Sequence, residues 1–180
     1  MPENQREKRP DELPDVLTGF DCVADKNAEI LILGSMPGVA SLQQQEYYAH
    51  PRNAFWKIMQ SLYGIDSELS YSQRLEQLKS NKIALWDVVH QCVRAGSLDS
   101  NIQADTVQAN DFSTLFKYSQ GITKVFFNGG KAAELYKRQV LDKADKRLVS
   151  IHYTQLPSTS PANARLTLAQ KIQAWQSLRA

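Results

Sequence analysis

The chain has 180 residues, of which 42% are hydrophobic and 22% are charged, and its formal net charge is +2 at pH 7. This length and composition are typical of one compact globular domain with a sizeable core. The mildly basic charge is compatible with a nucleic-acid partner but does not by itself indicate one.

The composition also excludes several classes of protein. Cys22 and Cys92 lie far apart and in no CxxC pattern, which argues against an iron–sulfur cluster, a structural zinc site and a disulfide framework. They favour a reducing, cytoplasmic setting. The polar N-terminus lacks the apolar core of a signal peptide, and no apolar stretch approaches the length that spans a bilayer. We therefore expect a polar N-terminal arm at residues 1–14 and a single domain at residues 15–180, with no membrane association.

Apolar runs and helical periodicities alternate along the chain. The run EILILG is apolar throughout, as in a strand buried on both faces, whereas NAFWKIMQSLYG repeats its apolar residues at helical spacing and ends at a glycine. In chain order, the patterns predict a strand at 29–34, helices at 53–64 and 70–81, a strand at 82–89, a helix at 110–121, a strand at 123–129, a helix at 129–141, a strand at 147–153 and a helix at 164–180. This alternation indicates an α/β fold with a central, mainly parallel four-stranded sheet.

Glycine, proline and polar residues gather where the predicted strands end. Residues 34–38 follow the first strand, 87–90 end the second, 128–130 end the third and 155–163 follow the fourth. Because ligands of parallel sheets bind beyond the carboxyl ends of the strands, these four segments are expected to form one crevice.

The loop after the first strand is unusually rich in such residues. Gly34 and Gly38 suit positive φ angles or close approach to a ligand, and Pro37 fixes the turn between them. Tyr47 and Tyr48 offer a flat face for stacking and a hydroxyl for anchoring, or they fill the edge of the core.

The same loop ends in HPRN. Asn53 suits the N-cap of the following helix, and its amide could instead hold a water molecule or the edge of a ligand. His50 has no cysteine or carboxylate motif beside it, so we do not interpret it as a metal ligand.

Two of these segments resemble motifs of the uracil-DNA glycosylase superfamily. LILGSMPGVASLQQQEYYAHPRNAFWKI (31–58) is similar to the first motif of its mismatch-specific branch, G-x-N-P-G followed by H-P-x-N-x-F-W, and LPSTSPANAR (156–165) resembles the second motif. NGGKAAELY (128–136) lies where relatives begin a helix with G-K-x-A. The full pattern, with Ser35–Met36 and a double tyrosine, looks closest to the hypoxanthine-DNA glycosylase (DNA-deoxyinosine glycosylase) branch.

The resemblance implies a single three-layer α/β/α glycosylase domain, active as a monomer on double-stranded or single-stranded DNA that contains a deaminated base. Such an enzyme flips the base out of the DNA and hydrolyses its N-glycosidic bond, here most directly that of hypoxanthine in deoxyinosine, without a metal or organic cofactor. Two alternatives stay open. One is a uracil or thymine mismatch glycosylase, and the other is a non-catalytic binder of nucleotides or damaged DNA.

The resemblance also assigns residues to the site. Met36 stands where mismatch-specific relatives carry a catalytic asparagine and Leu156 where classical uracil enzymes carry a histidine, so Asn53 takes the polar catalytic part. Asp87 is the second catalytic candidate: it could accept from N1–H of hypoxanthine or activate water, or it could be a helix cap or a salt-bridge partner. The expected base-binding residues are Gly34, Ser35, Met36, Pro37, Gly38, Tyr48 and Asn128. The expected DNA-binding residues are His50, Lys131, Pro157, Ser158, Thr159, Ser160 and Asn163.

Overall fold

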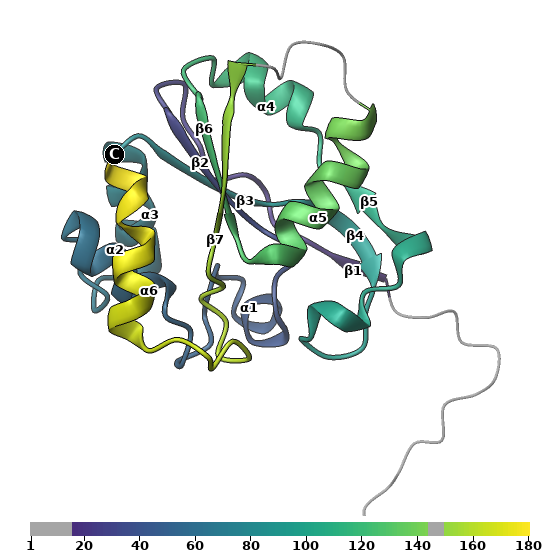
Figure 1. Ribbon diagram of the computed structural model, residues 1–180, viewed down its shortest axis with the longest axis horizontal. Coiled ribbons are helices and arrows are strands. Elements are labelled where there is room, and N and C mark those ends of the chain that lie inside the picture. Colours follow the sequence, from purple (N-terminus) through teal and green to yellow (C-terminus); the bar gives the residue numbers. More distant parts are fainter. Residues whose placement is uncertain (1–15, 144–149) are drawn as a thin grey trace, which may run out of the picture.

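The computed structural model describes residues 16–143 and 150–180 (Figure 1). The arm predicted at 1–14 lies outside the described residues. The strands are β1 (Val16–Thr18), β2 (Ile30–Gly34), β3 (Ile83–Asp87), β4 (Val89–Val93), β5 (Gln108–Ala109), β6 (Lys124–Asn128) and β7 (His152–Leu156). The α-helices are α1 (Val39–Gln44), α2 (Phe55–Tyr63), α3 (Tyr71–Ser80), α4 (Phe112–Tyr118), α5 (Gly130–Gln139) and α6 (Leu168–Trp175).

The central sheet has four strands in the order β3-β2-β6-β7, and every pair in it is parallel. The predicted α/β class and the mainly parallel sheet are therefore confirmed. Because all four strands run the same way, their carboxyl ends meet at one edge of the sheet. In Figure 1 this is the lower end, where α1 and the chain that follows β7 also lie.

Helices cover both faces of the sheet, as Figure 1 shows: α2, α3 and α6 lie on one side and α4 and α5 on the other. The side chains of β2 alternate accordingly, with Leu31 and Leu33 in the core beneath α4 and α5 and Ile32 in the core beneath α2 and α6. All three are fully buried, which explains why this strand is apolar throughout. The expected three-layer arrangement is confirmed.

A second, small antiparallel sheet in the order β1-β4-β5 was not predicted. It begins where the predicted strand 82–89 divides. The Val88 N–H donates to the Gly34 carbonyl and the Val89 N–H to the Ser35 carbonyl, so the chain crosses over the first loop instead of continuing in the central sheet. Val88 therefore links β3 to β4. Because both residues at 88–89 are apolar, periodicity alone cannot distinguish the two strands from one longer strand.

Two predicted boundaries were also wrong. The fourth strand is β7, which begins five residues and ends three residues later than the predicted 147–153, and residues 147–149 of that prediction lie outside the described residues. β7 is an edge strand with a half-exposed face, so its polar residues hide the strand pattern. The last helix begins at Leu168, not at 164, because Thr167 and Gln170 form a capping box there.

Among the residues that the structure describes, no helix combines the length and the apolar character needed to cross a bilayer.

Candidate active site

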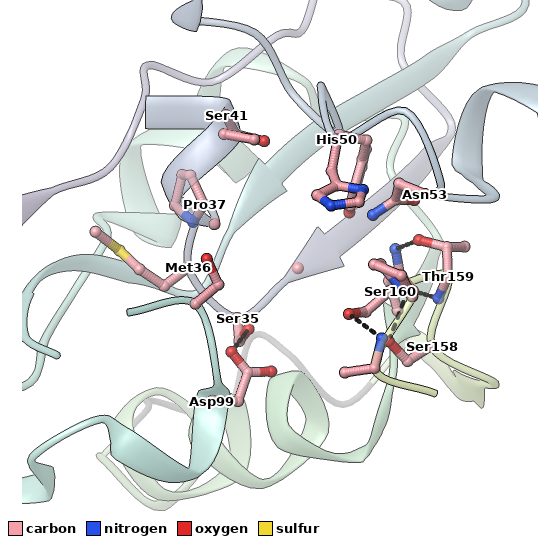
Figure 2. Close-up of a pocket in the computed structure, with 18 of the residues that line it drawn as sticks. Ser35, Met36, Pro37, Ser41, His50, Asn53, Asp99, Ser158, Thr159 and Ser160 are labelled. Atoms are coloured by element: carbon pink, nitrogen blue, oxygen red, sulfur yellow. Dashed lines mark hydrogen bonds between the residues drawn. The ribbon is translucent and has the colours of Figure 1, made fainter. Parts of the chain in front are cut away.

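The carboxyl ends of the strands surround a cavity of about 420 Å³, a volume within the range of small-molecule sites. Figure 2 shows its walls. The structure brings together nearly all of the predicted site residues: Gly34, Ser35, Met36, Pro37, Gly38, Tyr48, His50, Asn53, Asp87, Asn128, Ser158, Thr159, Ser160 and Asn163 line it. Two predicted residues do not. Lys131 forms an ion pair with Glu134 at 3.1 Å, and the Pro157 carbonyl accepts from the indole of Trp175.

Gly34 is needed for close approach, not for its φ angle. A Cβ built on it would lie 2.2 Å from Oδ1 of Asp87 and 3.2 Å from the Tyr48 hydroxyl. The positive φ expected at Gly34 and Gly38 was wrong, since neither residue is among the positive-φ glycines of the described chain. The first loop thus packs directly against the carboxyl group at the end of β3.

Met36 contributes no polar side chain to the site. It is 6% exposed, and a Cβ built on Gly19 would lie 3.8 Å from its sulfur atom. Figure 2 shows its side chain turned away from Asn53 and His50. Its backbone is held by buried Arg94, which donates to the carbonyls of Met36 at 3.4 Å and Pro37 at 2.5 Å.

The two tyrosines have different positions. Tyr47 is 2% exposed, packs edge-on against Phe20 and accepts the indole N–H of Trp56 on its carbonyl, so it belongs to the core. Tyr48 has φ +57° and stacks on Phe55 at 4.1 Å between ring centroids. A non-glycine residue at this φ is uncommon and often marks a functional site.

Tyr48 lines the cavity, and its hydroxyl is buried and has no hydrogen-bond partner of normal geometry among the described residues. Burial raises its pKa, and the charge of Asp87 adds to this, whereas the nearby Asn128 amide opposes it. The hydroxyl is therefore neutral at physiological pH and is available to a ligand as a donor or an acceptor.

Asn53 presents hydrogen-bond donors to the cavity. Its Oδ1 accepts from the N–H of Phe55, the first residue of α2, at 3.0 Å. Asn53 itself lies just outside the helix, one residue before the N-cap Ala54. Since that N–H can only donate, the atom facing it is the oxygen, and the NH₂ group points into the cavity, as Figure 2 shows. The predicted N-cap position was therefore wrong by one residue, although the Asn53 oxygen still binds the first N–H of α2.

His50 is fixed in a similar way. Its Nδ1 accepts from the Arg52 N–H at 3.1 Å, which leaves Nε2 as the N–H donor of the neutral ring. Figure 2 shows the ring beside Asn53.

The loop that carries the second motif (156–165), here called the second-motif loop, is held by hydrogen bonds to the end of β6. Asn128 accepts from the Thr159 N–H at 2.8 Å and donates to the Thr159 hydroxyl at 2.9 Å. Its amide therefore positions the loop, and Thr159, 1% exposed, anchors it. Buried Lys171 of α6 donates to the Asn163 carbonyl at 2.9 Å and holds the other end of the loop. These contacts leave Ser158 and Ser160 on the cavity wall.

A segment that the sequence analysis missed forms the remaining wall. After β4, the chain runs through Arg94 and Ser97 to the short 3₁₀ helix η1 (Asp99–Asn101). The Ser97 hydroxyl accepts from the Val39 N–H at the start of α1, and Asp99 accepts from the Ser35 hydroxyl at 2.7 Å. The sequence signal was a polar GSLDS turn beyond a strand, which by itself indicates only a turn.

Asp87 is the most perturbed acid at the site. The residue is 3% exposed, and its Oδ2 has no hydrogen-bond partner among the described residues. Burial, together with the charge of Asp99, raises the pKa of this carboxyl to about 8, although Arg94 opposes the shift. The salt-bridge interpretation finds no support in these contacts, because the carboxyl pairs with no cation among the described residues.

The described part of the chain holds no group of three or more His, Cys, Asp or Glu side chains that could bind a metal ion. The cavity instead offers amide, hydroxyl, imidazole and backbone groups together with two carboxyls. This donor set suits the recognition of a polar, planar ligand.

Comparisons with known proteins agree with this site. The model of the uracil DNA glycosylase superfamily matches residues 20–179. A hypoxanthine DNA glycosylase of Methanosarcina acetivorans is 37% identical over 161 residues, which are 89% of this chain and 96% of the relative. A hypoxanthine DNA glycosylase of Methanosarcina barkeri is 44% identical over 117 residues, 64% of this chain and 73% of the relative.

A solved structure shows the same fold. The solution NMR structure of a candidate uracil DNA glycosylase from Methanosarcina acetivorans superimposes with a TM-score of 0.73 at 34% identity, covering 92% of this chain and 100% of that one. The match of the family model to most of the chain, together with these relatives, shows the family: the chain belongs to the uracil DNA glycosylase superfamily.

Proposed function

We propose that this chain is a monofunctional, monomeric DNA glycosylase that flips a deaminated base out of DNA and hydrolyses its N-glycosidic bond, with hypoxanthine in deoxyinosine as the substrate. The observation that carries the proposal is the cavity itself. The loop after β2 and the loop after β7 meet there, around polar atoms that are buried and have no hydrogen-bond partner among the described residues. Two relatives that match most of their own length are hypoxanthine DNA glycosylases, which supports the choice of base.

The contacts of the site suggest how a flipped base would be held. The neutral Tyr48 hydroxyl and the Asp87 carboxyl are buried groups of lining residues, and they would bind the edge of the base. The NH₂ group of Asn53 donates to the base or to the attacking water. Stacking on an aromatic ring adds about 1–3 kcal/mol per base, and the second face of Tyr48, opposite Phe55, is the candidate surface.

DNA on either side of the flipped nucleotide would meet the second-motif loop. Ser158 and Ser160 hold hydroxyl groups at the cavity wall, and His50 presents an N–H. These groups suit phosphate oxygens, which accept hydrogen bonds from side chains of this kind.

The test is strand scission of labelled duplexes that each carry one inosine, uracil, mismatched thymine or xanthine, incubated with the protein and then cleaved with alkali. Scission at inosine supports the proposal. Scission at uracil or thymine alone would favour the mismatch enzyme, and tight binding without any scission would favour the non-catalytic binder.

Two variants of Asn53 sharpen the assay. Asn53→Asp keeps an oxygen for the Phe55 N–H but removes the cavity-facing NH₂, whereas Asn53→Ala removes both. We expect both to lose scission at inosine, and only Asn53→Ala to lose about 1 kcal/mol of stability with the lost helix-end contact. Full activity of Asn53→Asp would show that the NH₂ group is not needed.

A further inference from the structure

The site contains two carboxyl groups in contrasting surroundings. Asp87 is 3% exposed, and its Oδ2 has no partner among the described residues. Asp99 lies half-buried in the 94–101 segment and accepts from the Ser35 hydroxyl at 2.7 Å. Figure 2 shows its second oxygen pointing toward the side of the cavity where Ser158 lies. Both residues line the cavity, and Asp87 is the more deeply buried of the two.

The surroundings set the order in which the two protons leave. Burial and the charge of Asp99 raise the pKa of Asp87. Burial also raises the pKa of Asp99, but the Ser35 hydroxyl, Arg94 and Lys131 all favour its charged form. Because two neighbouring carboxyls resist being charged together, Asp99 ionises first and Asp87 keeps its proton to higher pH.

The other groups at the cavity are poor proton acceptors. Nε2 of His50 already carries the hydrogen, because Nδ1 accepts from a backbone N–H. The Tyr48 hydroxyl stays neutral, and Asn53 presents an NH₂ group, which only donates. Among the described groups that line the cavity, Asp99 is thus the one placed to take a proton from water.

We propose, resting on the proposed function, that Asp87 and Asp99 divide the acid and base work of the reaction: Asp87 donates a proton to the leaving purine, and Asp99 is a further catalytic residue that accepts a proton from the attacking water. In this proposal the flipped base lies against the buried Asp87, while the sugar and the water lie near Asp99, the less buried of the two carboxyls. Paired carboxyls with opposite protonation states are a known means of glycoside cleavage.

The step balances as a hydrolysis. The C1′–N9 bond breaks and its electron pair goes to N9, while N7 of the purine takes the proton from Asp87. The water oxygen bonds to C1′, and the proton it loses goes to Asp99. The products are neutral hypoxanthine and a C1′ hydroxyl, and proton exchange with solvent restores both carboxyls.

The first test separates the charge of Asp99 from its hydrogen bond to Ser35. Asp99→Asn keeps an acceptor for the Ser35 hydroxyl but loses the charge, Ser35→Ala keeps the charge but loses the bond, and Asp105→Asn, in the exposed next turn, is the matched control. In single-turnover cleavage of an inosine duplex we expect Asp99→Asn to be at least 100-fold slower, Ser35→Ala less than 10-fold slower and the control unchanged. Binding to a duplex with 2′-fluoro-deoxyinosine should be retained by all three.

The second test concerns the leaving group. Asp87→Asn should slow cleavage of deoxyinosine at least 100-fold, and 7-deaza-deoxyinosine, which lacks N7, should be cleaved slowly by wild type and within threefold of that rate by Asp87→Asn. A large difference between the two proteins on the 7-deaza substrate would overturn the assignment of Asp87 as the acid.

The outcomes distinguish this inference from the proposed function. If the wild type releases no hypoxanthine, the proposed function fails. If the wild type is active and Asp99→Asn is within threefold of it, the function stands and the catalytic assignment of Asp99 is overturned. If Ser35→Ala is as slow as Asp99→Asn, then Asp99 acts by holding the first loop and is not a proton acceptor.

Discussion

Asp87→Asn should make the protein more stable as well as less active. The carboxyl is buried at the end of β3 with an unpartnered oxygen, so ionising it in the folded state is costly. The amide has nearly the same shape and never ionises. Natural sites often retain such an unfavourable group because the reaction needs it.

The size of the effect follows from the difference in proton affinity. Asp87 has a pKa of about 8 in the folded chain against 3.8 for an ordinary Asp. Between these values the folded state keeps a proton that the unfolded state releases, so rising pH favours unfolding of the wild type. Since one pKa unit corresponds to about 1.4 kcal/mol, the wild type should lose about 4 kcal/mol relative to Asp87→Asn between pH 4 and pH 7. The loss continues until the carboxyl ionises in the folded state.

The assay is urea unfolding of both proteins at each pH unit from 4 to 8, followed by the fluorescence of the three tryptophans. Asp111→Asn serves as a control of opposite sign, because hydrogen bonds from Thr114 lower the pKa of Asp111. That variant should lose a little stability relative to wild type as the pH rises. A constant difference between wild type and Asp87→Asn over the whole range would refute the reasoning, because it would mean that Asp87 is already ionised in the folded chain.

Three further variants test how the site is held. Gly34→Ala should destabilise the fold by about 1–3 kcal/mol and reduce cleavage, since its Cβ would lie 2.2 Å from Asp87; an unchanged melting temperature would contradict the close packing. Arg94→Met removes a buried guanidinium from three backbone carbonyls and should cost about 3 kcal/mol or more in urea unfolding. Lys171→Met should weaken binding of inosine duplex, measured by fluorescence anisotropy, more than the single-turnover rate, because Lys171 holds the loop through the Asn163 carbonyl.

The sequence predicted what depends on local pattern. Continuous apolar runs located β2 and β6, and the motif loops were placed correctly at the ends of parallel strands. Asn53 was predicted as the N-cap of the next helix or as a ligand-holding residue; the N-cap is Ala54, one residue later, but the Asn53 oxygen binds the first helical N–H. Such features follow from periodicity, capping preference and topology, all of which a single sequence contains.

The sequence could not show which distant residues complete the site. The contact of Asp99 with Ser35 spans 64 positions and depends on the crossing at Val88–Val89, where the chain leaves the central sheet. Nothing local distinguishes Asp99 from any other acidic residue in a turn. The buried Arg94 joins its segment to the first loop through the carbonyls of Gly96, Met36 and Pro37, contacts that only the three-dimensional structure shows.

The 94–101 segment explains how this chain can tolerate methionine in its first loop. Met36 sends its side chain into the core, so this position offers the cavity no polar side chain, and the neighbouring Ser35 supplies a hydroxyl. A neighbouring segment then brings a carboxylate to the same wall, and Arg94 fastens the two together through backbone carbonyls. Because the charged group and the loop that it serves come from different parts of the chain, a mutation in either segment should disturb both. Double variants of Ser35 and Asp99 should therefore be non-additive in cleavage rate, as expected for residues that share one contact.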